Sequence, residues 1–265
     1  MNKESGDKMK KLITSLFLMG LLAVSSASYA ECNSCSQAGK YSVRASNGNM
    51  PMVHWAVVMA KKGKQPEIGA LAVKYVAPEV AKEEGTYALY GGLGIDTPDN
   101  NILLEIYEDE EAYEKHVSSK GFLKYREERE PIMEKLIILE AEPIALEQKT
   151  SGIGTVIYLN KFDIVPEKLE EYKKLAVCEA KRAVKDEPCV MGMYFTAEKD
   201  NPNCIHIMTI FRFQSSFDKY FASKEYLKFK EKYEPMLESF HEVKCLPTKV
   251  KFNGRGHHSN NKVVK

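Results

Sequence analysis

Two stretches of the chain carry one pattern, and that pattern decides the fold. Residues 109–133 read DEEAYEKHVSSKGFLKYREEREPIM, and residues 214–237 read QSSFDKYFASKEYLKFKEKYEPML. When the chain is shifted against itself by 104 residues, nine of the 22 positions in 113–134 match those in 217–238. Average composition would give about one or two matches by chance. The sequence therefore contains an internal duplication, and two copies indicate paired domains and not a solenoid.

Each copy predicts the same order of elements. Residues 52–60 and 154–164 are rich in β-branched and aromatic residues, which is typical of strands. An amphipathic helix at 166–187 has a counterpart at 67–83, which we expect to kink at Pro78. Two strands joined by a proline-containing turn follow, then the quoted helix, which we expect to break at Gly121. A closing strand with a proline, expected at an edge or a bulge, completes the unit.

This order, β-α-β-β-α-β, predicts an α+β fold made of ferredoxin-like units. Each unit leaves one sheet face exposed, and two such faces can pack together. The duplication would then supply within one chain what two identical subunits supply elsewhere. We therefore expect the tandem units to form an intramolecular dimeric α+β barrel.

The N-terminus reads as an export signal. Residues 9–30, MKKLITSLFLMGLLAVSSASYA, contain a basic run, an apolar core too short to span a bilayer, and a small-residue end. Cleavage is expected after Ala30, which makes the protein periplasmic or extracellular; a retained membrane anchor is the alternative. The predicted organisation is a signal peptide at 1–30, a polar linker at 31–50, domains at 51–149 and 153–252, and a disordered basic tail at 253–265.

Charge and cysteine content exclude some functions. Lys and Arg number 38 and Asp and Glu 37, interspersed along the chain, so nothing indicates binding to nucleic acid or to an anionic membrane. Six cysteines in an exported protein favour disulfides, although fifteen full pairings are possible. Cys32 and Cys35 form a CxxC at the mature terminus, where a local disulfide or flexible thiols are expected. No set of residues predicts a metal site.

Residues 101–125, NILLEIYEDEEAYEKHVSSKGFLKY, resemble the antibiotic biosynthesis monooxygenase family. In that family a strand ending in an acidic–aromatic pair runs into D-x-x-A, then a histidine, then S-x-x-F. The matching residues here are Glu105, Tyr107, Asp109, Ala112, His116, Ser119 and Phe122. The resemblance implies the dimeric α+β barrel. Through several relatives, it also implies oxidation of a quinol or anthrone by O2 without metal or flavin, and hence no cofactor.

His116 is the candidate catalytic residue. Removing a proton from a quinol or anthrone makes it a strong reductant toward O2, and histidine is the natural base near neutral pH. His116 follows Tyr113 by three residues and so lies beside an inward-facing stripe of the helix. The candidate substrate-binding residues are Tyr90, Glu105, Tyr107, Tyr113 and Phe122. The alternative is that His116 is a histidine satisfied at the edge of the core and that the tyrosines are packing residues.

The second copy departs from this pattern. Tyr220 stands where His116 does, and a phenol with a pKa of about 10 is a poor base. Asn160 resembles the first-strand asparagine of haem-degrading relatives. However, Arg126 and Lys230 occupy the positions of their haem-ligating histidine, which argues against haem ligation of that kind. We therefore expect the chemistry in the first unit and a structural role for the second.

Two hypotheses about function follow. The first is an exported, cofactor-independent monooxygenase that oxidises a small aromatic or quinol-type substrate. The second is a non-catalytic barrel of the cell envelope that binds a hydrophobic ligand or a protein partner. A pocket that contains His116 and offers the substrate a path favours the first. A His116 on the outer surface, or a cavity filled by the protein's own aromatic side chains, favours the second. A thiol-based redox role for Cys32 and Cys35 is a third hypothesis, against which their terminal position argues.

Overall fold

The computed structural model describes residues 40–245 and 250–252. The predicted signal peptide, the CxxC segment and the C-terminal tail lie outside these residues. Within the described part of the chain, no helix is both long enough and apolar enough to cross a membrane.

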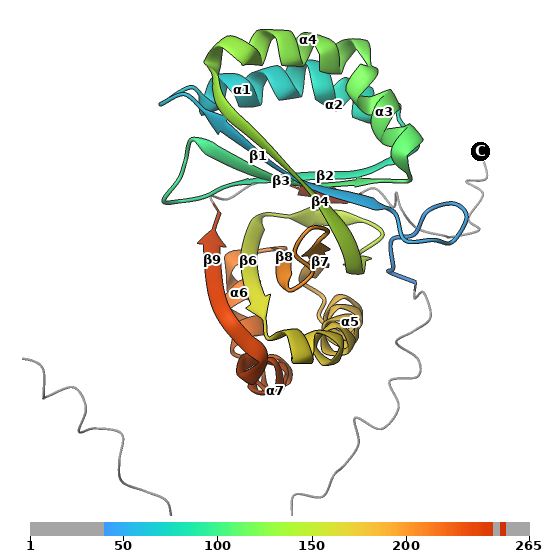
Figure 1. The fold of residues 1–265 in the computed structure, drawn as a ribbon, viewed down its shortest axis with the longest axis vertical. Helices are drawn as coiled ribbons and strands as arrows, with labels where there is room; N and C mark the ends of the chain where they lie inside the picture. The colour runs from blue at the N-terminus through green and yellow to red at the C-terminus, as the bar shows by residue number, and fades with distance from the viewer. Residues whose placement is uncertain (1–39, 246–249, 253–265) are drawn as a thin grey trace, which may run out of the picture. The chain divides into compact units, whose positions relative to one another are not determined.

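Eight strands form one antiparallel sheet in the order β2-β3-β1-β4-β7-β8-β6-β9 (Figure 1). The strands of the first unit are β1 (Met52–Ala60), β2 (Thr86–Leu93), β3 (Asn100–Tyr107) and β4 (Met133–Gln148). Those of the second unit are β6 (Val156–Ile164), β7 (Val190–Glu198), β8 (Cys204–Phe211) and β9 (Leu237–Lys244). The two halves of the sheet repeat one order, which confirms the tandem ferredoxin-like units. Two short strands, β5 (Gly152–Gly154) and β10 (Val250–Phe252), pair antiparallel in a separate two-stranded sheet.

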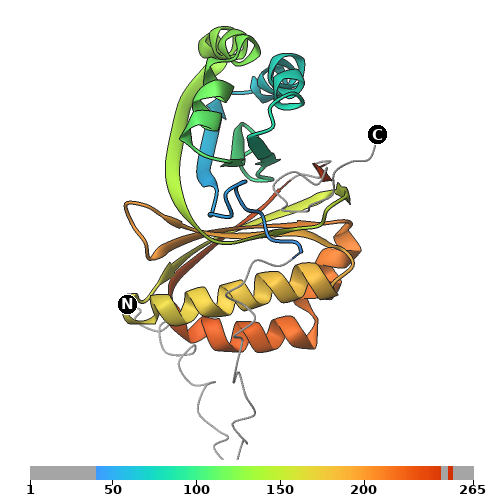
Figure 2. The ribbon, with the colours of Figure 1, turned by 90° about the vertical axis from the view of Figure 1, so that its right-hand side faces the viewer.

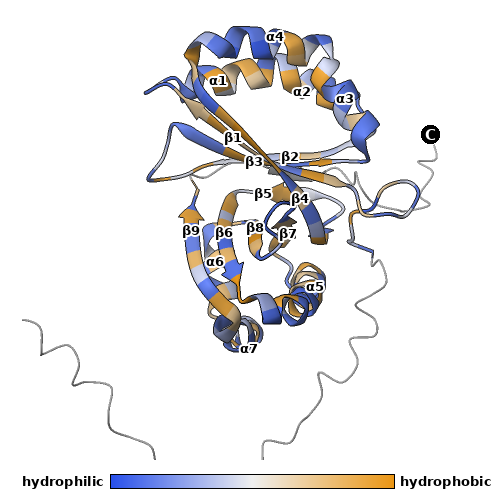
Figure 3. Ribbon diagram, viewed as in Figure 1, coloured by the Kyte–Doolittle hydropathy of each residue, from blue (hydrophilic) through white to orange (hydrophobic). Residues whose placement is uncertain are grey.

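Helices cover the outer face of each half of the sheet (Figure 2). The first unit carries α1 (Gln65–Leu71), a π-helical turn (Ala72–Val76), α2 (Ala77–Val80), α3 (Glu110–Ser118), α4 (Lys120–Arg129) and a 3₁₀ turn (Glu130–Ile132). The second carries a 3₁₀ turn (Pro166–Lys168), α5 (Leu169–Asp186), α6 (Gln214–Phe221), α7 (Lys224–Tyr233) and a 3₁₀ turn (Glu234–Met236). The outward surfaces of α3 and α4 are mainly hydrophilic, as expected for helices with one face in solvent (Figure 3).

Strand β4 joins the two units. Its first half pairs with β1 as far as Ala141, and its second half pairs with β7 from Ala141 to Gln148. The register shifts between Pro143 and Ala145, so the proline lies at a bulge, as the sequence predicts. At the opposite edge Gly94 bridges Cys245, and the Ile95 amide donates to the Lys244 carbonyl at 2.9 Å. These contacts close the sheet into the dimeric α+β barrel architecture.

Three apolar cores hold the units together. The central core lies between the two halves of the sheet and contains Trp55, Leu104 and Tyr194. The Trp55 indole also donates to the Thr196 hydroxyl at 2.8 Å, which ties β1 of the first unit to β7 of the second. The other two cores lie between each half-sheet and its helices. Since strand side chains alternate between faces, β1, for example, contributes Trp55 to the central core and Val58 to an outer core.

Two details of the first-unit helices concern predictions from the sequence. The helix predicted at 67–83, with a kink at Pro78, is interrupted by the π-helical turn Ala72–Val76, which ends two residues before the proline, and α2 continues through Pro78. The expected break at Gly121 is wrong, because the chain leaves helical geometry at Ser119, whose side chain caps α4 by accepting from the Phe122 amide. Gly121 lies inside α4 for a packing reason. A Cβ there would lie 2.3 Å from the Tyr75 carbonyl oxygen.

Candidate active site

The candidate residues come from three elements that meet on the helix-covered side of the first unit. In β3, Leu104 and Ile106 face the central core, so Glu105 and Tyr107 face the helices. Asp109 then caps α3 by accepting from the Ala112 amide at 2.9 Å, and this fixes where the helix starts. The sequence therefore brings the carboxylate and phenol of the strand beneath the side chains of α3.

His116 is almost completely buried, with 1% of its surface exposed. Its Nδ1 lies 2.8 Å from Oε2 of Glu83, which comes just after α2. When the Glu83 carboxylate accepts this bond, Nδ1 is the donor, and in the neutral form of the imidazole the lone pair is then on Nε2. Nε2 is buried without a hydrogen-bond partner among the described residues. Rings of Phe122 and Tyr107 lie 5.0 and 5.7 Å from the imidazole, so this nitrogen sits in an aromatic environment.

Glu105 and Tyr107 form a hydrogen-bonded pair beside the histidine. The Tyr107 hydroxyl donates to Oε2 of Glu105 at 3.1 Å. Burial raises the pKa of Glu105 to about 7, against the opposing effects of the Tyr107 hydrogen bond and the Arg129 charge. Glu105 thus exists as a mixture of acid and carboxylate near neutral pH, and it can donate or accept a hydrogen bond there.

Tyr113 and a second histidine extend the cluster. The His54 ring lies 4.8 Å from the Tyr113 ring and 6.3 Å from the Tyr107 ring. His54 is 4% exposed, and neither ring nitrogen has a hydrogen-bond partner among the described residues. Burial lowers its pKa, so it is neutral near pH 7 and can both donate and accept. The Tyr107 ring therefore neighbours both histidines, His54 at 6.3 Å and His116 at 5.7 Å.

An open pocket of about 370 Å³ adjoins this cluster, and His54 is part of its lining. Carboxylates dominate the polar part of the lining, which includes Glu108, Asp109, Glu110, Glu140, Glu142 and Lys199. Such a surface disfavours anionic ligands. His54 is the one member of the cluster among the residues that line this pocket, and His116 is not one of them.

Five of the six predicted residues meet here, and Tyr90 does not. Tyr90 packs in the central core, with its ring 5.7 Å from that of Tyr194 and its hydroxyl donating to Gln148 at 3.2 Å. The alternation of side chains along β2 places it on the sheet face away from the helices. Two participants were missed. His54 could have been found as a polar residue on the helix-facing side of an apolar strand. Glu83 lies after the interrupted helix, and no sequence pattern around it indicates a contact with His116.

The second unit repeats the geometry with different chemistry. Tyr220, the counterpart of His116, is buried and donates to Oε1 of Glu179 at 2.6 Å. Arg182 neutralises that carboxylate through contacts of 2.6 and 2.9 Å. Burial, followed by the nearby Glu179, raises the pKa of Tyr220 well above its ordinary value. This position therefore cannot act as a base near neutral pH.

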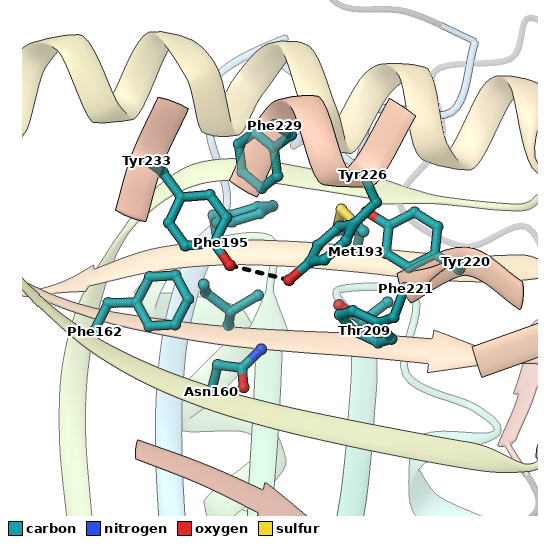
Figure 4. Close-up of a pocket in the computed structure, with 11 residues that line it drawn as sticks. Asn160, Phe162, Met193, Phe195, Thr209, Tyr220, Phe221, Tyr226, Phe229 and Tyr233 are labelled. Carbon is teal, nitrogen blue, oxygen red and sulfur yellow. Dashed lines mark hydrogen bonds between the residues drawn. The ribbon is translucent and has the colours of Figure 1, made fainter. Parts of the chain in front are cut away.

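Aromatic side chains fill the corresponding space between helix and sheet (Figure 4). Phe162 from β6 and Phe221 from α6 line it with Tyr226 and Tyr233 from α7, whose hydroxyls are 3.0 Å apart. The remaining cavity is about 20 Å³, roughly the size of one water molecule. Its polar wall includes Asn160, whose Oδ1 is buried without a partner among the described residues. These aromatic side chains pack against one another, in line with the structural role expected for the second unit.

Comparison with known families gives a consistent result for both units. The family model described as antibiotic biosynthesis monooxygenase (ABM) matches residues 51–128 and 155–232, more than half of the chain. The chain belongs to the ABM family. Both ABM regions include the β-α-β-β-α order described above, and the match to two regions agrees with the duplication. Among curated proteins, none matches the chain.

Solved structures share the tandem ABM fold. A protein of Lactobacillus acidophilus NCFM, provisionally described as a monooxygenase, superposes with a TM-score of 0.72 and 17% identity. The match covers 78% of this chain and 98% of that one. A similarly described protein of Fusobacterium nucleatum gives a TM-score of 0.71, 16% identity and coverage of 78% and 96%. An anthrone oxidase-like protein gives a TM-score of 0.52 and 8% identity, and the match covers 80% of this chain and 97% of that one. At these identities the likeness concerns the fold alone.

Proposed function

We propose that this ABM protein is a cofactor-independent monooxygenase that oxidises a small aromatic, quinol- or anthrone-type substrate with O2 in its first unit. One observation carries the proposal. The partly buried carboxylate of Glu83 holds the buried imidazole of His116, whose unpartnered nitrogen lies in an aromatic environment. A histidine held in this way is equipped to take a proton from a substrate. The ABM fold and the monooxygenase descriptions of its structural relatives support the same class of reaction.

The reaction starts with proton transfer to Nε2 of His116 from the CH2 group of an anthrone or the hydroxyl of a hydroquinone. Glu83 stabilises the imidazolium that forms, because its carboxylate accepts the Nδ1 hydrogen. The substrate anion then transfers one electron to O2, and the resulting radical pair combines to a peroxide. For an anthrone, the imidazolium returns the proton and loss of water leaves a ketone. The balance is CH2 + O2 → C=O + H2O, which needs no external reductant.

Other residues of the cluster position the substrate. Tyr107 and Glu105 provide hydrogen bonds for a substrate oxygen, and Phe122 and Tyr113 provide apolar surface for a planar ring. Since Nε2 of His116 is buried against Tyr107 and Phe122, binding requires at least one of these rings to move. The carboxylates around the adjoining pocket favour neutral or cationic aromatic substrates over aromatic acids.

Oxygen uptake on a panel of neutral hydroquinones and anthrones tests the proposal. Wild-type protein should consume O2 well above the autoxidation rate, and His116→Gln should lower kcat by about 100-fold or more, as expected for loss of a general base. Tyr220→Phe is the matched control at the duplicated position and should retain activity. Equal rates for wild type and His116→Gln would remove this mechanism.

The alternative function is a non-catalytic barrel that binds a hydrophobic ligand. The aromatic filling of the second unit favours it for that half of the molecule (Figure 4). If no substrate on the panel is consumed but an aromatic compound binds with a change in Trp55 fluorescence, the binding function replaces the catalytic one.

Export, with cleavage after Ala30, is part of both proposals. N-terminal sequencing of the protein recovered from outside the cytoplasm tests it.

A further inference from the structure

Three potential metal ligands converge on the inner face of the second unit, away from the candidate active site. Glu198 ends β7, and Cys204 and His206 lie two residues apart on the adjacent strand β8. Residues two apart on a strand project from the same face, and Met208 places that face toward the central core. The ligand atoms of the three residues all lie within 4.8 Å of one another.

We propose that Glu198, Cys204 and His206 form a binding site for a divalent first-row transition metal such as Zn²⁺, with a fourth position open to water. A thiolate, an imidazole and a carboxylate are the donor types that zinc takes in proteins. Three protein ligands with one open position are the usual arrangement where zinc keeps a bound water. The site belongs to the second unit and is independent of the proposed chemistry at His116.

The distances fit a tetrahedral ion with little rearrangement. Bond lengths of about 2.3 Å to sulfur and 2.0 Å to nitrogen or oxygen require ligand atoms roughly 3.3–3.6 Å apart. Cys204 Sγ lies 3.6 Å from His206 Nε2, which meets this requirement. Glu198 Oε1 is closer, at 2.9 Å from the sulfur and 2.6 Å from the nitrogen, because hydrogen bonds hold the carboxylate there. A shift of under about 1 Å by this carboxylate completes the geometry.

The three proposed ligands lie on paired strands, and two of them are partly exposed to solvent. The β7 and β8 strands lie side by side within the eight-stranded sheet, which fixes the backbone positions of the ligands. Cys204 is fully buried, whereas the Glu198 and His206 side chains remain 20% and 16% exposed. An ion can therefore enter from the side of the carboxylate and imidazole, and the open coordination position would lie there.

One neighbouring charge opposes cation binding. The ammonium of Lys161, on β6, lies 3.8 Å from Oε1 of Glu198. Asp163, on the same face of β6, is paired across the strands with Cys204 and accepts from the Ser239 hydroxyl. Replacing Lys161 by an uncharged residue of similar length should therefore tighten metal binding. A cluster that served only as a hydrogen-bond network would predict no such gain.

Trp55 provides an intrinsic reporter for the site. Its ring lies 5.4 Å from that of His206, and it is the only tryptophan in the chain. Trp55 belongs to the first unit and supplies no ligand, so it reports on the site without being part of it. Co²⁺ is the best probe. It adopts the same geometry as Zn²⁺, quenches a nearby indole, and shows a thiolate-to-metal charge-transfer band when cysteine is a ligand.

The experiment is a Co²⁺ titration of the full chain carrying Cys32→Ser and Cys35→Ser, so that the N-terminal thiols cannot contribute. The expected result is a charge-transfer band and Trp55 quenching that saturate together at one ion per chain. Both signals should be lost in Cys204→Ala and strongly weakened in His206→Gln. Both should be kept in Cys189→Ser, and Lys161→Met should bind several-fold more tightly.

Two results would overturn the proposal. One is the absence of a thiolate band in the parent protein, and the other is a band that persists in Cys204→Ala. Circular dichroism of each variant identifies any that fail to fold. Should Cys204→Ala be one of them, Glu198→Gln decides, because it keeps the size of the side chain and removes the charge that a cation requires.

Discussion

At the scale of single residues, the function proposed here rests on one difference between duplicated positions. His116 pairs with Glu83 and keeps Nε2 unpartnered, whereas Tyr220 pairs with Glu179, which Arg182 neutralises. Both positions bury a polar side chain against a carboxylate from the preceding helical region. Only the first offers an unpartnered ring nitrogen that can accept a proton. The two copies thus share the placement of a buried polar side chain against a carboxylate, but they differ in whether that side chain can act as a base.

The buried acid Glu105 gives a prediction for stability against pH. Its pKa rises from 4.5 to about 7 on folding, so between these values the folded protein holds more protons than the unfolded chain. The free energy of unfolding should therefore fall as the pH rises from about 4.5 to 7 and level off above that range. Glu105→Gln removes this fall in the free energy of unfolding, so the variant should be more stable than wild type at pH 8 by up to about 3 kcal/mol.

Urea unfolding of both proteins at pH 4 and pH 8 measures this effect. The advantage of Glu105→Gln should be present at pH 8 and absent or much smaller at pH 4. An advantage that is the same at both values would contradict the burial-driven pKa of Glu105. Glu130→Gln, which removes a carboxylate at an exposed position of the same unit, is a suitable control.

At the scale of secondary structure, periodicity predicted almost everything that is local. The strands β1 and β7 begin and end where their apolar patterns do, and the bulge at Pro143 follows from the missing amide of proline. Gly121 was misjudged because a glycine in a helix has two explanations, a break or a close contact. Only the packed neighbour, the Tyr75 carbonyl, distinguishes them.

That close contact gives a prediction about helix packing. Gly121→Ala places a Cβ 2.3 Å from the Tyr75 carbonyl oxygen and 2.5 Å from the Glu79 side chain, so α4 must move away from the π-helical turn and α2. We expect a loss of about 1–3 kcal/mol in the free energy of unfolding, the usual cost of overpacking. Gly69→Ala, in α1, is the matched control.

A Cβ at Gly69 meets no atom within 4 Å, and alanine is the better helix former. Gly69→Ala should therefore be neutral or stabilising by up to about 1 kcal/mol. Thermal unfolding followed by circular dichroism compares the two variants. If Gly121→Ala were as stable as Gly69→Ala, the contact between α4 and the Tyr75 carbonyl would not limit packing.

The candidate site was only partly predictable for a similar reason. Glu105, Tyr107, Tyr113, His116 and Phe122 lie within 18 consecutive residues, so strand and helix periodicity places them together. Glu83 reaches His116 from 33 residues away, and His54 reaches Tyr113 from a different strand. Contacts of that range depend on how elements pack, which periodicity does not determine.

At the scale of the whole molecule, the two ABM units share one sheet and one central core, so we expect them to unfold together. The β4 strand pairs with β1 and with β7, and the central core takes side chains from both units. Leu146, in the second half of β4, is fully buried in that core. Leu146→Ala should lower the free energy of unfolding by about 2–5 kcal/mol, through lost burial and a new cavity.

The unfolding transition of Leu146→Ala tests this cooperativity. Fluorescence of Trp55 reports on the first unit and the central core, and far-ultraviolet circular dichroism reports on all helices. Both should give one transition at the same, lowered denaturant concentration. Two separate transitions, with Trp55 unaffected by the substitution, would mean that the units fold independently.

The central claim is that His116 removes a proton from the substrate before O2 reacts, and one measurement tests it directly. An anthrone is mixed with the protein in the absence of O2, and the absorption spectrum of the bound compound is recorded. Wild type and Tyr220→Phe should both produce the red-shifted spectrum of the anthrone anion, and His116→Gln should leave the neutral spectrum. An anion spectrum of equal intensity in His116→Gln, or none in wild type, would contradict the account.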